Sequence, residues 1–283
     1  MRREIEQSIV TGGTAENVTG TNSDFGRLSD MDAFTNRLGQ YVSTAQDVSA
    51  SIRGLNPTLQ NFKAGTDIVR AGDPTGTLFV IQNGWAIRYR EIDDGRRQIL
   101  NFMLPGDIFD LQALGDLKAD HSVAALDDVE VWVFSARDFL SGLKQSGPVA
   151  TAFWWSAVQE ESILREQIVR IGQLSAKERI GHLLLELQRR LSIVLGVETL
   201  LLRLPVTRSD IGDALGLTPV HVSRTISGMK RMELIEEDRS SLRIINRDKL
   251  REMSKFDPDY LHISRLDLET EIFELPATNK QTG

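Results

Sequence analysis

The sequence contains no cysteine among its 283 residues. A disulfide framework, a thiolate zinc site, a cysteine-ligated iron–sulfur cluster and a cysteine nucleophile are therefore excluded. Long hydrophobic runs are also missing, because no apolar stretch approaches the ~18 residues that a membrane-spanning helix needs. The opening stretch MRREIEQSIVTGGTAENVTGTNSD lacks the apolar core of a signal peptide. We therefore expect a cytoplasmic protein without a membrane segment.

Positive charge is in deficit, since 33 Lys and Arg against 40 Asp and Glu give a net charge of −7. This balance argues against a protein that coats nucleic acid indiscriminately. It still allows a local basic patch, because electrostatic fields act within a screening length of about 8–10 Å. The 41% hydrophobic and 26% charged residues are typical of a soluble globular protein.

The first half of the chain changes character twice. Residues 1–28 are rich in Thr, Gly, Asn and Ser and are predicted to form a mobile extension. A weak helical period follows from Leu28 to Leu55. Between Phe62 and Phe139, runs of β-branched and aromatic residues are separated by glycines, and NGW and DDGR are turn signals. We predict an α+β fold in which residues 29–147 form a sensor domain built on an antiparallel β-roll.

A long amphipathic helix is predicted for residues 148–173. Its apolar positions step by three and four residues, as in the seam of a coiled coil. This pattern favours a homodimer, although a helix that packs only on its own domain would give a similar pattern. A glutamate on the seam would face its own copy and would destabilise the pair unless it finds a partner. The seam residues are Trp154, Ala157, Glu161, Leu164, Ile168 and Ile171.

Residues 174–256 carry the signals of a winged helix-turn-helix. Ser175 and Glu178 have the spacing of a capping box that opens a helix ending near Gly196. Thr207 is predicted to cap a short helix that ends at Gly216, where glycine adopts a left-handed conformation at little cost. Thr218 then caps a second helix whose first residue is Pro219. The stretch LIEEDRSSLRII predicts two short strands, the wing, and residues 257–283 form a tail without an assigned role.

The second helix of this pair carries its cationic and hydroxyl side chains on one side. Arg224 is suited to a bidentate contact with guanine, Ser223 can bond several bases, and Val220 can touch a thymine methyl group. The alternative is a helical hairpin with a solvated polar face. The predicted DNA-binding residues are Thr207, Arg208, Ser209, Thr218, Pro219, Val220, His221, Ser223, Arg224, Ser227, Lys230 and Arg231.

The order of roll, long helix and winged helix-turn-helix resembles the Crp/Fnr superfamily of bacterial transcription regulators, over Phe62 to Asn246. The stretch TRSDIGDALGLTPVHVSRTISGMKRMELI is similar to the helix-turn-helix of the Fnr/FixK branch. The resemblance implies a homodimer on a two-fold symmetric promoter site that recruits or blocks RNA polymerase. It also implies that Arg224 reads a base, with Ser223 beside it. Val220 stands where the motif has a glutamate, so the half-site should differ at the base which that carboxylate reads.

The effector segment departs further from the cyclic-nucleotide-binding relatives. Leu111 stands where those proteins have the glutamate that binds the ribose, and His121, Ser122 and Val123 replace the Arg-Ser-Ala that binds the phosphate. Losing the arginine removes a charge-assisted contact of about 1.5–3 kcal/mol. We therefore expect no cAMP binding of the usual kind, and assign no cofactor or effector. The residues of this degenerate pocket are Gly106, Asp107, Phe109, Leu111, His121, Ser122 and Val123.

Three alternatives remain for the roll. It could be a dimer scaffold in a regulator without an effector, or His121 could ligate a heme, as in heme-sensing relatives. A metal-dependent enzyme of the cupin type would need several histidines and a glutamate around one metal. The histidines are His121, His182, His221 and His262, of which one lies in the predicted roll. We therefore expect neither a metal site nor an enzyme.

Overall fold

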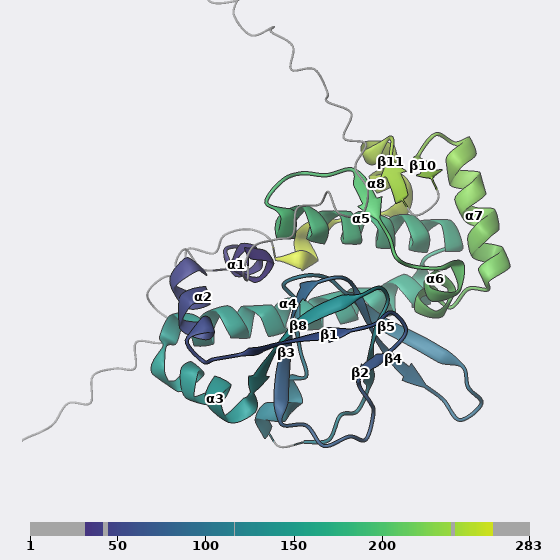
Figure 1. Ribbon diagram of the computed structural model, residues 1–283. Coiled ribbons are helices and arrows are strands. Elements are labelled where there is room, and N and C mark those ends of the chain that lie inside the picture. The colour runs from purple at the N-terminus through teal and green to yellow at the C-terminus, as the bar shows by residue number, and fades with distance from the viewer. Residues whose placement is uncertain (1–31, 42–44, 116, 239–240, 263–283) are drawn as a thin grey trace, which may run out of the picture.

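The computed structural model describes residues 32–41, 45–115, 117–238 and 241–262 (Figure 1). The predicted extension at residues 1–28 and residues 263–283 of the predicted tail lie outside this range. Two helices come first, α1 (Asp32–Leu38) and α2 (Ala45–Arg53), where the sequence shows only a weak helical period.

The predicted β-roll is present as two antiparallel sheets. The first has the strand order β1-β8-β3-β6 and the second β2-β7-β4-β5. Phe79 and Phe109 stack between them with ring centroids 5.0 Å apart. The strands are β1 (Thr58–Phe62), β2 (Asp67–Val69), β3 (Thr77–Asn83), β4 (Ala86–Glu91), β5 (Arg97–Met103), β6 (Ile108–Phe109), β7 (Ser122–Ala125) and β8 (Val129–Ser135).

Helices cover the roll. After β8 come α3 (Ala136–Gln145), α4 (Gly147–Gln173) and α5 (Ala176–Leu195), and α5 runs back above α4 (Figure 1). The predicted capping box opens α5: the Ser175 hydroxyl accepts from the Glu178 amide, and the Glu178 carboxylate accepts from the Ser175 amide. The chain thus breaks at Leu174, between the predicted long helix and the predicted capping box.

The C-terminal domain consists of α6 (Arg208–Leu215), α7 (Pro219–Arg231), α8 (Arg247–Ser254) and a small sheet. The sheet contains β9 (Leu201–Arg203), β10 (Ile235–Asp238) and β11 (Ser241–Ile244), in the order β10-β11-β9. The predicted wing hairpin is therefore confirmed, and β9 joins it as a third strand. A short 3-10 helix, η2 (Pro258–Leu261), follows α8.

The two domains share a continuous hydrophobic core. Ile99 and Phe102 of β5 belong to the same cluster as Leu183 and Leu187 of α5 and Leu215 of α6. The side chain of Arg97 on β5 also pairs with Asp210 and Asp213 of α6, at 2.7 and 2.9 Å. The helix-turn-helix domain is therefore packed against the roll in this structure.

Candidate nucleic-acid interface

The helix-turn-helix is built by the caps that the sequence predicts. The Thr207 hydroxyl accepts from the Asp210 amide at 3.1 Å, and the Asp210 carboxylate accepts in return from the Thr207 amide at 2.8 Å. Thr218 opens α7 in the same way, since its hydroxyl accepts from the His221 amide at 3.2 Å. These bonds satisfy backbone donors that the first turn of a helix leaves free. Gly216 ends α6 with φ at +65°, as predicted.

The angle between α6 and α7 depends on a glycine inside α6. A Cβ added at Gly212 would lie 2.4 Å from the carbonyl oxygen of Leu217, which is closer than any real contact. The turn therefore folds directly onto α6, and the buried Val222 and Ile226 of α7 pack against it. This fixes the direction in which the other face of α7 points.

That other face lies open to solvent. The predicted base-reading residues Val220, Ser223 and Arg224 are exposed, and Val220 keeps 68% of its surface accessible. His221, Ser227, Lys230, Arg231, Thr207, Ser209, Thr218 and Pro219 are exposed too, whereas Arg208 is half-buried. Within the part of the chain that the structure describes, Arg224 has no ion-pair partner. Its guanidinium is thus available to a ligand outside the chain.

Glu237 on the wing was not predicted to belong to this surface. Its carboxylate pairs with Arg208 of α6, and it lies 3.6 Å from the ammonium group of Lys230 at the end of α7. One acidic side chain therefore links the first helix, the second helix and the wing. It also offsets two of the cations predicted to contact DNA, which leaves Arg224 as a cation of the α7 face that pairs with none of the described carboxylates.

The degenerate effector segment is part of the roll and runs from the turn before β6 through a 3-10 helix, η1 (Leu111–Gly115), to the start of β7. Leu111 is half-buried in η1, and Phe109 is buried in β6. His121 is buried just before β7, with Nδ1 2.6 Å from the Asp120 carboxylate. Burial lowers the pKa of His121, so the imidazole is neutral at pH 7. Arg88 of β4 is buried nearby and pairs with Glu160 of α4.

The remaining residues of this segment are placed as follows. Ser122 and Val123 begin β7, and the Ser122 hydroxyl accepts from the Ala71 amide at 3.0 Å. Gly106 has φ at +85°, and an added Cβ there would lie 2.7 Å from the carbonyl oxygen of Ala33. Asp107 is buried and pairs with arginines rather than facing an empty pocket.

Asp110 gives this segment a measurable pH dependence. Its side chain is buried, and burial raises the pKa of the carboxyl from 3.8 to about 6. Between pH 3.8 and about 6, the folded state therefore holds a proton on Asp110 that the unfolded state has lost. The contribution of this proton to the free energy of unfolding is full below pH 3.8 and disappears as the pH rises through about 6. Asp110→Asn removes this contribution but tolerates the positive φ of +67°.

Between pH values of about 4 and 7.5, the free energy of unfolding of the wild type should fall relative to that of Asp110→Asn by about 2 kcal/mol. Urea denaturation of both proteins at several pH values measures this difference. The other titrating groups are common to the two proteins, so their effects cancel when one free energy is subtracted from the other. Parallel curves for the two proteins would show that Asp110 titrates normally.

The predicted seam on α4 lies on the face that the other described residues leave most exposed. Val149, Ala152 and Ile163 are buried, while Gln159 contacts Leu261 at the end of η2 and Ser162 contacts His262 after it. Ile168 remains 72% exposed and Trp154 47% exposed. Ala157, Leu164 and Ile171 are half-buried, and the exposed Glu161 pairs with Arg165 at 2.6 Å. The predicted seam thus forms one solvent-facing stripe.

The residues that the structure describes contain no group of three or more His, Asp or Glu side chains that could hold a metal ion. None of the helices among these residues has the length and apolar character that crossing a membrane requires.

Comparison with known proteins gives matches to both halves of the chain. Residues 59–146 match the model of the cyclic nucleotide-binding domain, and residues 178–253 match that of the Crp-like helix-turn-helix domain. The nitrogen fixation regulation protein FixK of Rhizobium meliloti is 31% identical over 195 residues, which cover 68% of this chain and 85% of that protein. FixK of Bradyrhizobium diazoefficiens is 31% identical over 171 residues, or 60% of this chain and 71% of that protein.

Among solved structures, FixK2 from Bradyrhizobium japonicum is similar with a TM-score of 0.62 and 26% identity. The match covers 70% of this chain and 96% of FixK2. The relatives therefore share both the roll and the helix-turn-helix.

Proposed function

The chain belongs to the Crp/Fnr family of DNA-binding transcription regulators, and we propose that it acts as a homodimer on a two-fold symmetric promoter site. The observation that carries this proposal is the exposed face of α7, where Arg224 has no carboxylate partner among the described residues. Two such helices related by a two-fold axis enter successive major grooves, about 34 Å apart.

The stripe on α4 supplies the dimer contact in this proposal. It contains Trp154 and Ile168, which stay 47% and 72% exposed against the other described residues of a single chain. A second copy would bury both sets of side chains against each other, with Glu161 held by Arg165 at the edge. The dimer then acts in the cytoplasm, where it recruits or blocks RNA polymerase at the promoter.

The base contacts follow from the side chains on α7. Arg224 donates to O6 and N7 of a guanine, and Ser223 bonds a neighbouring base. Val220 cannot accept a hydrogen bond from a cytosine amino group. At the base that a glutamate reads in Glu-bearing relatives, this chain therefore does not select cytosine by such a bond. Selection of bound duplexes from random DNA tests this: we expect a palindrome with a guanine in each half-site. An enriched pool without two-fold symmetry would contradict the proposal.

Arg224→Ala should weaken binding to the selected site by about 1–3 kcal/mol and relax the preference for one guanine. Lys230→Ala is the matched comparison, because Lys230 is assigned to phosphate and should weaken selected and random duplexes alike. Titration of both variants against both duplexes measures the difference. If Arg224→Ala retains affinity and selectivity, another residue reads that base.

The roll is proposed to sense a signal other than cAMP. Leu111 offers no carboxylate to a ribose, and the neutral His121 beside Asp120 offers no positive charge to a cyclic phosphate. Arg88 is already paired with Glu160. Calorimetry is expected to show no binding at micromolar cAMP, and a micromolar dissociation constant would overturn this part. We assign the chain no cofactor and no enzymatic reaction, since its four histidines lie in separate elements.

A further inference from the structure

A cluster of buried charges lies where the DNA-binding domain meets the roll. Arg37 of α1, Asp107 of the β5–β6 turn, Arg170 of α4, and Glu186 and Arg190 of α5 each keep less than a tenth of their surface accessible. Charged side chains are rarely buried this deeply unless they are paired. The elements that contribute them are far apart in the sequence, so these contacts define how the two domains sit.

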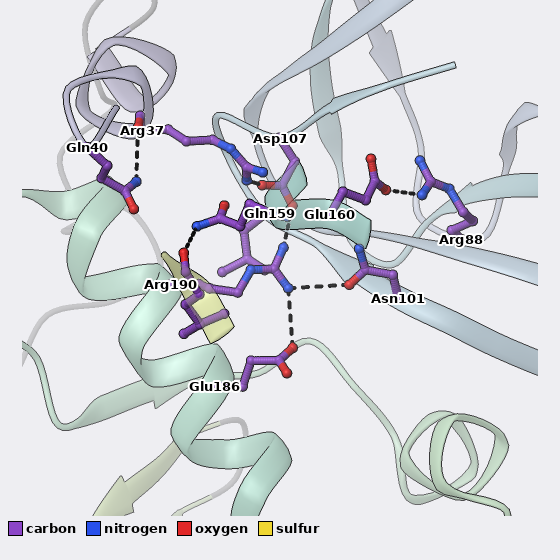
Figure 2. A network of polar contacts seen from close by, with 11 residues as sticks. Arg37, Gln40, Arg88, Asn101, Asp107, Gln159, Glu160, Glu186 and Arg190 are labelled. Atoms are coloured by element: carbon purple, nitrogen blue, oxygen red, sulfur yellow. Dashed lines mark hydrogen bonds and ion pairs between the residues drawn. The ribbon is translucent and has the colours of Figure 1, made fainter. Parts of the chain in front are cut away.

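Asp107 is the shared member of this cluster. One oxygen of its carboxylate pairs with Arg37, and the other lies 2.6 Å from Nη2 of Arg190 (Figure 2). The Asp107 carboxylate also accepts from the Leu104 amide at 2.9 Å, which fixes its direction. A single carboxylate on the roll therefore joins α1 to the helix that leads into the DNA-binding domain.

Helix α1 contacts both domains at once. Its Phe34 and Leu38 pack in the core beside Ile108 of the roll. On another side, the side-chain amide of Asn36 donates to the carbonyl oxygen of Val194 in α5 at 2.8 Å. The close approach of Gly106 to Ala33 presses α1 onto the turn that carries Asp107.

Two carboxylates each serve more than one arginine in this cluster. Asp107 pairs with Arg37 and Arg190, and Glu186 pairs with Arg170 and lies 3.6 Å from Arg190. Glu160 and Glu166 lie close enough to act on Arg37 and Arg170 as well. The buried Nε atoms of the three arginines have no hydrogen-bond partner among the described residues. Burial of these charges opposes the closed arrangement, whereas the shared carboxylates favour it. Two opposing terms of this kind are what a bistable element requires.

Asp107 also lies at the start of the effector segment, next to Gly106 and close to Phe109. A displacement of this segment would therefore reach α5 directly through Arg190, without passing along α4. We propose that Arg37, Asp107 and Arg190 form an ionic clasp that holds the DNA-binding domain closed against the roll, with α1 as its releasable part. Its regulatory meaning rests on the proposed function, whereas the clasp itself can be measured without DNA.

The cysteine-free chain makes the measurement direct, since introduced cysteines are the only labelling sites. Asn61→Cys on β1 and Lys249→Cys on α8 place spin labels on exposed positions of the two domains. Double electron–electron resonance is recorded on labelled protein diluted with excess unlabelled chain, so that each dimer carries one labelled subunit. The otherwise unchanged chain should give one narrow distance distribution.

In Asp107→Asn and Arg37→Gln, the fraction of molecules outside that distribution should rise about tenfold or more, because the shared contact is lost. Arg37→Gln removes one cation and leaves Asp107 paired with Arg190, so this variant is expected to fold. Arg96→Gln breaks an exposed ion pair with Asp94 and should change nothing. A broad distribution in the unchanged chain, or a narrow one in both folded variants, would overturn the clasp. Loss of promoter binding would not affect this result.

Discussion

Ile168→Glu is expected to produce a folded monomer that has lost most of its affinity for a two-fold symmetric site. Ile168 is 72% exposed in a single chain, so its replacement removes no contact from the core. In a dimer through the α4 stripe, the new carboxylate would be buried close to its own copy, at a large cost in free energy. A monomer binds one half-site only, and losing the linked second site lowers the affinity by about 10²–10⁴-fold.

Analytical ultracentrifugation and titration with the selected duplex measure the two parts of this prediction. Ile92→Glu is the matched control, because Ile92 is also exposed, at 50%, but lies after β4, away from the stripe. The control should remain dimeric and bind normally. Both variants should stay folded and unfold in a cooperative thermal transition. A dimeric Ile168→Glu with full affinity would place the dimer contact elsewhere.

The parts of the fold that the sequence predicts correctly are those encoded locally. Thr207, Gly216 and Thr218 act on backbone groups within four residues of themselves, so their roles could be read from neighbouring letters alone. The strands of the roll were predicted from alternation and turn glycines, which are equally local. The exposed face of α7 follows from the helical period once Val222 and Ile226 are assigned to the core.

What the sequence could not predict depends on contacts between distant segments. Glu237 reaches Arg208 across 29 residues, and Arg190 reaches Asp107 across 83. No local pattern marks either partner, because Glu237 is one of three consecutive acidic residues and Asp107 follows a turn glycine, and carboxylates in such places usually face solvent. The start of the predicted tail is a similar case: Tyr260 donates to Glu186 at 2.7 Å, and Leu261 is buried against α4. Residues 257–262 are therefore part of the packed domain boundary.

Glu186→Ala is expected to lower the free energy of unfolding by about 3–5 kcal/mol, because it removes one partner of a buried ion pair and leaves the other charge unpaired. Glu186 is 3% exposed and Arg170 only 1% exposed as side chains. The same carboxylate also accepts from the Tyr260 hydroxyl and lies 3.6 Å from Arg190. Three groups from α4, α5 and η2 would thus lose their acceptor together.

Glu198→Ala is the matched control, outside the α4 stripe. Glu198 follows α5 and also pairs with an arginine, Arg247, but the two side chains are 59% and 37% exposed. Water solvates both charges after the pair is broken, so the loss should be at most about 0.5 kcal/mol. Urea denaturation of the two variants compares the same chemical change at opposite extremes of burial. Equal losses would show that the cluster between α4 and α5 is hydrated in solution, because only dehydration of the remaining arginines makes the removal of Glu186 costly.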